Sequence, residues 1–238
     1  MTRDVTERRE EVRRNLELVR KRIAAACDET DRDPGEVTLT VVTKFFPASD
    51  VRLLAELGVN DVGENRHQEA EAKAAQTRSL DLRWHFIGTL QSNKAAAVAD
   101  YADVVESVDR PKLLKGLSKG AHQRGAVIDC LVQVSLDPEE AAEGRGGAAP
   151  EDVPALAEQV AAAEGLRLRG VMAVAPLGQD PTPAFARLAE VAEQVRRVDP
   201  AATWISAGMS GDLEQAIRAG ATHVRVGSAV LGRRPAIK

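Results

Sequence analysis

Apolar residues recur at helical spacing over the first 27 residues. Seven of them follow the 3.6-residue period, with charged residues between them: Val5, Val12, Leu16, Leu18, Val19, Ile23 and Ala26. Asp33-Pro34-Gly35 then reads as a turn that ends the segment. The pattern predicts a helix over residues 2–27, so residues 1–27 form an N-terminal element packed on the rest of the chain.

A different pattern begins at residue 37. Residues 37–43 form a β-branched run that is apolar or Thr, as expected for a strand covered on both faces. Seven more strands are predicted at 61–63, 83–88, 104–108, 128–136, 169–175, 203–207 and 223–227. Between strands lie segments rich in Ala, Leu, Glu and Lys, which predict helices at 49–57, 92–101, 111–124, 150–164, 181–198 and 212–219.

Eight strands separated by helices predict parallel pairing with right-handed crossovers. Such a chain can close as a (β/α)8 barrel or lie open as a doubly wound sheet. The strand count favours the barrel, as does the absence of a Gly-rich dinucleotide turn after the first strand. We therefore predict an α/β fold in one domain, 1–238: a single (β/α)8 TIM-type barrel with an extra N-terminal helix. Residues 137–150, rich in Gly, Ala and Glu, are expected to form a mobile loop after the fifth strand.

Composition narrows the function classes. The net charge is -4 and aromatic residues make up 3%, so a surface that stacks nucleic-acid bases is not expected. No apolar run reaches the roughly 18 residues of a membrane span, and the N-terminus is too charged for a signal peptide. Cys27 and Cys130 are far apart and read as free core thiols. We expect a cytoplasmic protein that binds neither nucleic acid nor membrane and holds no metal.

Lys44 directly follows the apolar run of the first strand and precedes Phe45 and Phe46. In a barrel, functional groups gather at the C-terminal ends of the strands. A lysine between apolar residues at such a position is desolvated, which lowers its pKa and increases the neutral amine that attacks an aldehyde. An ordinary strand-end lysine reaching solvent remains the alternative from position alone.

Two small-residue corners follow the seventh and eighth strands. The first is Ser206-Ala207-Gly208-Met209-Ser210-Gly211-Asp212, and the second is Arg225-Val226-Gly227-Ser228. Loops at these two places commonly bind phosphate in this fold, because small residues and helix N-termini expose backbone N–H groups. Simple N-capping by Ser210 and a tight turn at Gly227 are the alternatives. Together the corners predict a phosphate site.

Strand alternation places Arg225 on the opposite face from Val224 and Val226, toward the barrel mouth. A guanidinium there needs an acceptor: a phosphate, a carboxylate or a ring nitrogen, with a structural salt bridge as the alternative. His85 lies between Trp84 and Phe86 and reads as a hydrogen-bonded core histidine rather than a catalytic base.

Six segments in order resemble one family. They are Val41-Val42-Thr43-Lys44, Gly63-Glu64-Asn65, the stretch 84–94 (WHFIGTLQSNK), Arg167-Leu168-Arg169-Gly170-Val171-Met172, Gly208-Met209-Ser210-Gly211-Asp212 and Val224-Arg225-Val226-Gly227-Ser228. Over nearly the whole chain the sequence resembles the pyridoxal phosphate homeostasis proteins (the YggS/PROSC group), whose fold is similar to the N-terminal barrel domain of alanine racemase.

The resemblance implies that Lys44 holds pyridoxal 5'-phosphate (PLP) as a Schiff base. It implies that Asn65 lies beside the cofactor, that Arg225 faces the pyridine nitrogen, and that the phosphate is surrounded by Ser210, Gly211, Gly227 and Ser228, with Met209 in the same cofactor-binding set. Arginine has no acceptor, so it can only donate to an unprotonated ring nitrogen. The ring is then a weaker electron sink than one paired with a carboxylate.

Two positions depart from the family pattern. Members often carry a lysine two positions after the Schiff-base lysine, where this chain has Phe46, and another in the loop after the fifth strand, where it has Glu143-Gly144-Arg145-Gly146. If those lysines help to hand PLP on, Arg145 is the nearest substitute here.

The resemblance favours a monomeric PLP carrier with no catalytic residue, whose recipients are apo PLP-dependent enzymes. The alternatives are a PLP-dependent amino-acid racemase and a phosphosugar enzyme without PLP. Two-base racemisation needs an acid/base group on each face of the substrate carbon. The one tyrosine, Tyr101, falls in a predicted helix before the fourth strand, and a second domain is not expected.

Overall fold

The computed structural model of the chain describes residues 5–137 and 146–233. Eight parallel strands close into a barrel in sequence order, with β1 paired to β8, so the predicted (β/α)8 barrel is confirmed. The strands are β1 Thr38–Val42, β2 Asp61–Glu64, β3 Arg83–Phe86, β4 Val104–Val108, β5 Ile128–Gln133, β6 Leu166–Met172, β7 Trp204–Ser206 and β8 His223–Val226.

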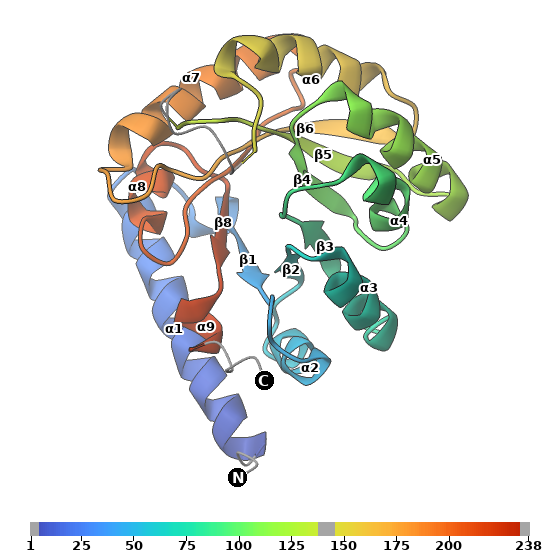
Figure 1. Ribbon diagram of the computed structural model, residues 1–238. Coiled ribbons are helices and arrows are strands. Elements are labelled where there is room, and N and C mark those ends of the chain that lie inside the picture. The colour runs from blue at the N-terminus through green and yellow to red at the C-terminus, as the bar shows by residue number, and fades with distance from the viewer. Residues whose placement is uncertain (1–4, 138–145, 234–238) are drawn as a thin grey trace.

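Helices surround the barrel (Figure 1). They are α1 Val5–Asp28, α2 Ala48–Glu56, α3 His67–Gln76, α4 Ala95–Ala99, α5 Leu114–Arg124, α6 Val153–Ala162, α7 Thr182–Val198, α8 Leu213–Arg218 and α9 Ser228–Leu231, with 3-10 turns at Pro34–Glu36, Ser92–Lys94, Pro111–Leu113 and Pro150–Asp152. The turns account for the early starts predicted for α4, α5 and α6. The sequence pattern did not predict α3, because its two buried residues are Ala70 and Lys73 and it has no apolar stripe.

The N-terminal helix packs on the barrel as predicted. Its buried side chains include Val12, Leu16, Val19 and Ile23, and it contacts α8 and α9, beside which it runs in Figure 1. A bidentate ion pair joins Arg22 to Glu214 on α8, with N···O distances of 2.6 and 2.9 Å. Both apolar burial and charge therefore hold α1 against the last part of the barrel.

Strand β6 runs from Leu166 to Met172, whereas 169–175 was predicted, and a bulge interrupts its pairing with β5 near Gly170. Gly170 has a φ of +146°, and a Cβ there would lie 1.9 Å from the carbonyl oxygen of Trp204. Only glycine fits where β6 and β7 approach so closely. Residues 166–169 alternate between apolar and charged side chains, so the missed start of β6 precedes the bulge.

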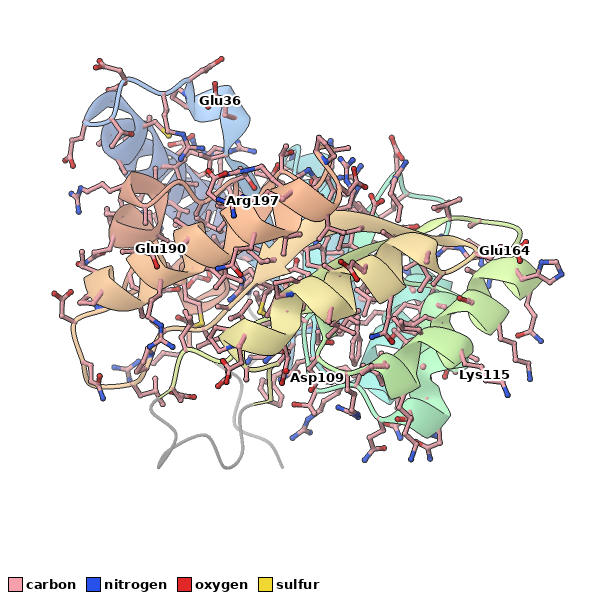
Figure 2. All side chains as sticks on the ribbon, turned by 90° about the horizontal axis from the view of Figure 1, so that it is seen from above. Glu36, Asp109, Lys115, Glu164, Glu190 and Arg197 are labelled. Atoms are coloured by element: carbon pink, nitrogen blue, oxygen red, sulfur yellow. The ribbon has the colours of Figure 1, made fainter. Side chains whose placement is uncertain are left out.

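The outer helices bury one face each. On α7, Phe185, Leu188 and Val195 are buried, while the exposed Glu190 and Arg197 lie on the outside, where Figure 2 shows α7 alongside α6. Within residues 5–137 and 146–233, no helix combines the length and apolar content needed to span a membrane.

Candidate functional site

A cavity of about 240 Å³ lies at the C-terminal ends of β1, β7 and β8. Its lining residues are Val42, Lys44, Phe46, Ile87, Met209, Ser210, Gly211, Arg225, Gly227, Ser228 and Gly232. The fold thus brings together seven of the eight residues predicted to bind the cofactor, although they come from opposite ends of the chain. The cavity is smaller than the roughly 300–1,000 Å³ of pockets for drug-sized ligands, so it suits a small molecule.

Lys44 is half-buried two residues past the end of β1. The next residue, Phe45, has a φ of +71°, which is uncommon for a bulky side chain. Its backbone N–H donates to Glu69 Oε1 at 2.6 Å, and the following Phe46 is buried in the cavity wall. Glu69 on α3 therefore fixes the turn after β1, and this turn sets the position of Lys44.

The loops after β7 and β8 meet at the cavity. The backbone N–H of Arg225 donates to the carbonyl of Gly208 at 2.9 Å, and the hydroxyls of Ser210 and Ser228 lie 3.4 Å apart. A Cβ on Gly227 would lie 3.1 Å from the carbonyl oxygen of Val42. The two loops thus bring small residues and two hydroxyls to the cavity, and phosphate binding there stays a prediction.

Arg225 is buried and points into the barrel, as strand alternation predicted. Its guanidinium donates to Ser206 Oγ at 2.7 Å and to the carbonyl of Ala173 at 2.8 Å, and it lies 3.7 Å from Glu106 Oε2. Burial lowers the pKa of Arg225, and the nearby Glu106 carboxylate opposes this shift. Arg225 therefore both forms a structural salt bridge with Glu106 and lines the cavity.

Sequence reasoning missed a buried ion cluster behind Lys44. Lys73 on α3 is 5% exposed and donates to Thr43 O at 2.8 Å, Glu64 Oε1 at 2.6 Å and Glu69 Oε1 at 2.7 Å. Burial raises the pKa of Glu64, while the hydrogen bonds from Lys73 and Thr43 oppose that shift. The four-residue spacing of Glu69 and Lys73 was the one available signal, and it usually marks an exposed pair.

Asn65 does not line the cavity. Its backbone lies against Gly88, where a Cβ would come within 2.2 Å of the Asn65 carbonyl oxygen. The side-chain Oδ1 of Asn65 is buried and has no hydrogen-bond partner among the described residues. A role beside the cofactor stays a prediction for Asn65. Arg145 and most of the loop predicted at 137–150 lie outside the described residues.

His85 is a hydrogen-bonded core histidine, as predicted. Its Nδ1 lies 2.7 Å from Glu106 Oε1 and its Nε2 lies 2.9 Å from Asp61 Oδ1. Burial lowers the pKa of His85, but the hydrogen bonds to Asp61 and Glu106 outweigh it and raise the pKa to about 9. Asn93 and Lys94 lie in a 3-10 turn outside the cavity lining.

Comparisons with known proteins extend over this whole barrel. The protein-family model of the alanine racemase N-terminal domain matches residues 10–235. A pyridoxal phosphate homeostasis protein of Mycobacterium bovis is 41% identical over 244 residues, covering 96% of this chain and 95% of the relative. The solved structure of PipY from Synechococcus elongatus, with PLP bound, is 34% identical at a TM-score of 0.77, covering 90% of this chain and 100% of PipY.

Alanine racemase of Corynebacterium glutamicum shares the fold at 14% identity and a TM-score of 0.68, over 97% of this chain and 64% of the racemase. The homeostasis proteins and alanine racemase share this barrel fold, so the fold alone does not give the family. The matches at 41% and 34% identity give it. Since they cover the strands that build the cavity as well as the segments that resemble the family, the chain belongs to the pyridoxal phosphate homeostasis proteins (the YggS/PipY group), built on the alanine racemase N-terminal domain.

Proposed function

We propose that this chain binds PLP in the cavity at the barrel mouth, holds it as a Schiff base on Lys44, and serves intracellular PLP homeostasis without substantial turnover. The observation that carries the proposal is the meeting of Lys44, Arg225 and the Ser210–Ser228 pair around one cavity. The PLP-bound structure of PipY supports the ligand.

The residues present suit the chemistry of PLP. The Lys44 amine can condense with the cofactor aldehyde, forming a C=N bond and releasing water. There is open space at Gly211 beside the two serine hydroxyls for a phosphate, since a Cβ on Gly211 would meet nothing within 4 Å. The buried Oδ1 of Asn65 has no hydrogen-bond partner among the described residues. A buried acceptor of this kind is usually satisfied by a ligand or an ordered water.

When bound, PLP supplies an aldehyde and an electron-withdrawing ring, and Arg225 limits the second of these. A guanidinium can only donate, so it favours an unprotonated pyridine nitrogen and a weaker electron sink. Tyr101, the only tyrosine in the sequence, lies away from the cavity, stacked on His67 with ring centroids 5.9 Å apart. Both observations support a carrier over a racemase.

The Lys44 assignment is tested by loading the purified protein with PLP and recording the absorbance of the protonated Schiff base. Borohydride reduction followed by peptide mass spectrometry should place the adduct on Lys44. We expect Lys44→Ala to lose the band and the adduct, and Lys94→Ala, outside the cavity, to keep both. A reducible adduct on another lysine in the wild type would show that Lys44 is not the Schiff-base residue.

The carrier role is tested by assaying alanine and serine racemisation with PLP-loaded protein. We expect no turnover approaching the order of one per second that is typical of enzymes, and transfer of PLP to an apo PLP-dependent enzyme when the two are mixed. Racemisation at an enzymatic rate would instead establish the racemase alternative. Gel filtration would test the monomer expected from the sequence. The absorbance band of the Schiff base would exclude a phosphosugar enzyme without PLP.

A further inference from the structure

The inside of the barrel carries a line of polar side chains where branched apolar residues usually fill the core. Five side chains from β8, β7, β4, β3 and β2 make up this interior line: Arg225, Ser206, Glu106, His85 and Asp61. Arg225 donates to Ser206 Oγ at 2.7 Å, and Ser206 Oγ donates to Glu106 Oε2 at 2.5 Å. His85 then links the two carboxylates: its Nδ1 lies 2.7 Å from Glu106 Oε1 and its Nε2 lies 2.9 Å from Asp61 Oδ1.

Charge alternates along the interior line. Both ring nitrogens of His85 face carboxylate oxygens, which only accept, so both must donate and the ring is an imidazolium. Burial alone would raise the pKa of Glu106, but the hydrogen bond from His85 and the charges of His85 and Arg225 lower it to about 2. The two cations and two carboxylates therefore balance between the cavity and the opposite end of the barrel.

Other charged and titratable groups face the line without breaking its alternation. The His223 ring centroid lies 6.3 Å from that of His85, and burial lowers the pKa of His223 to about 4, so it is neutral at pH 7. Arg83 lies 3.9 Å from Asp61 at the exposed end, and the charge of Asp212 acts on Arg225 at the cavity end. None of these groups replaces Glu106 as the partner of His85.

Three of the four charged members of the interior line are buried: Arg225, Glu106 and His85. Burying charges is expensive in free energy unless each is paired and hydrogen-bonded, and apolar residues of similar size often serve stability as well. Only one member of the interior line, Arg225, lines the cavity. Ser206, which accepts a hydrogen bond from the guanidinium, and Glu106, which compensates its charge, both lie outside the cavity lining.

We propose that Glu106 and His85, anchored by Asp61, are positioning residues that hold Arg225 aimed at the ring nitrogen of PLP. This inference rests on the proposed function, because it assumes that PLP occupies the cavity with its ring nitrogen toward Arg225. Through Ser206 and Arg225, Glu106 then influences how strongly the protein withdraws electrons from the cofactor ring.

The test is the ¹⁵N signal of ring-labelled PLP bound to wild-type protein and to two variants. In Glu106→Gln the signal should move toward that of a pyridine nitrogen without a hydrogen bond, and Asp61→Asn should move it less. Ser107→Ala is the matched control, since Ser107 is as buried as Glu106 on the same strand and its hydroxyl has no partner among the described residues. Its ring-nitrogen signal should equal that of the wild type.

An unchanged ring-nitrogen signal in folded Glu106→Gln and Asp61→Asn would overturn the inference. If Glu106→Gln does not fold, Asp61→Asn alone decides, because Asp61 is partly exposed and tolerates an isosteric amide. The apo wild type supplies a second readout: His85 should show two protonated ring nitrogens at pH 7.5, and a neutral ring would also overturn the inference. A wild type that takes up no PLP would instead contradict the proposed function.

Discussion

The ammonium of Lys73 lies 2.8 Å from the carbonyl oxygen of Thr43, the residue directly before Lys44. The same Nζ donates to Glu69, whose carboxylate accepts the backbone N–H of Phe45, directly after Lys44. The buried Lys73 on α3 thus holds the backbone on both sides of the proposed Schiff-base lysine, directly at Thr43 and through Glu69 at Phe45. All three of its donors are used, so the turn that aims Lys44 depends on a helix outside the barrel.

Lys73→Met should destabilise the protein strongly and weaken PLP uptake. The substitution leaves Glu64 and Glu69 without their cation, and breaking a buried pair costs about 3–5 kcal/mol. Urea unfolding would measure the loss, and the exposed Lys115→Met should stay within about 0.5 kcal/mol of the wild type. Adding Glu64→Gln to Lys73→Met should recover part of the stability. Equal unfolding free energies for Lys73→Met and Lys115→Met would refute the role of the cluster.

The two buried histidines should give the apo protein a stability maximum near pH 6.5. The folded-state pKa of His85 is raised to about 9, against about 6.5 unfolded, so its contribution is complete below pH 6.5 and is lost as pH rises to 9. Burial lowers the pKa of His223 to about 4, so stability rises with pH between 4 and 6.5.

Urea unfolding at intervals from pH 4 to 9 checks this pH dependence. Each group contributes a slope of at most about 1.4 kcal/mol per pH unit. His85→Gln should remove the decline above pH 6.5, whereas the exposed His122→Gln should keep it. A wild-type unfolding free energy that does not fall between pH 6.5 and 9 would show that His85 is not protonated in the fold.

Gly170→Ala should lower the free energy of unfolding by more than the usual 0.5–3 kcal/mol, on the order of 4 kcal/mol or above. The new Cβ would lie 1.9 Å from Trp204 O, so the β6–β7 pairing would have to separate. Gly178→Ala is the matched control, because its φ is also positive, at +73°, but nothing lies within 4 Å. Thermal unfolding of both variants would compare them, and similar losses would exclude steric contact as the cause.

Replacing both cavity serines should weaken PLP binding more than pyridoxal binding. Ser210→Ala/Ser228→Ala removes two hydroxyls proposed to contact the phosphate, and each hydrogen bond to a charged group contributes about 1.5–3 kcal/mol. Equilibrium titration with both ligands would measure the difference, with the exposed Ser49→Ala on α2 as control. Equal losses of affinity for the two ligands would place the phosphate elsewhere.

The barrel was predictable because its strands are short β-branched runs separated by amphipathic helices. Strand ends also predicted where Lys44 and Arg225 would meet, since parallel strands share one functional edge. Helix α3 was missed because its buried positions include a lysine. The start of β6 was missed although residues 166–169 alternate between apolar and charged side chains, as a strand with one buried face does.

The burial of Lys73 and Glu106 could not be predicted from the sequence. Each is an ordinary charged residue until other segments supply an opposite charge and a further hydrogen bond: Glu64 and Thr43 for Lys73, His85 and Ser206 for Glu106. Local patterns carry no information on such pairs, because burial of a charge is decided by three-dimensional contacts.

The close approach of Gly227 to Val42 joins the last strand of the barrel to the first, and the cavity lies at that seam. A ligand bound there occupies a site that does not exist until residues 44 and 225 have come together. Binding is therefore thermodynamically linked to ring closure: at 100 times its dissociation constant, a ligand adds about 2.7 kcal/mol to the stability of the closed state. The free energy of unfolding of the closed barrel would then rise with the concentration of free ligand.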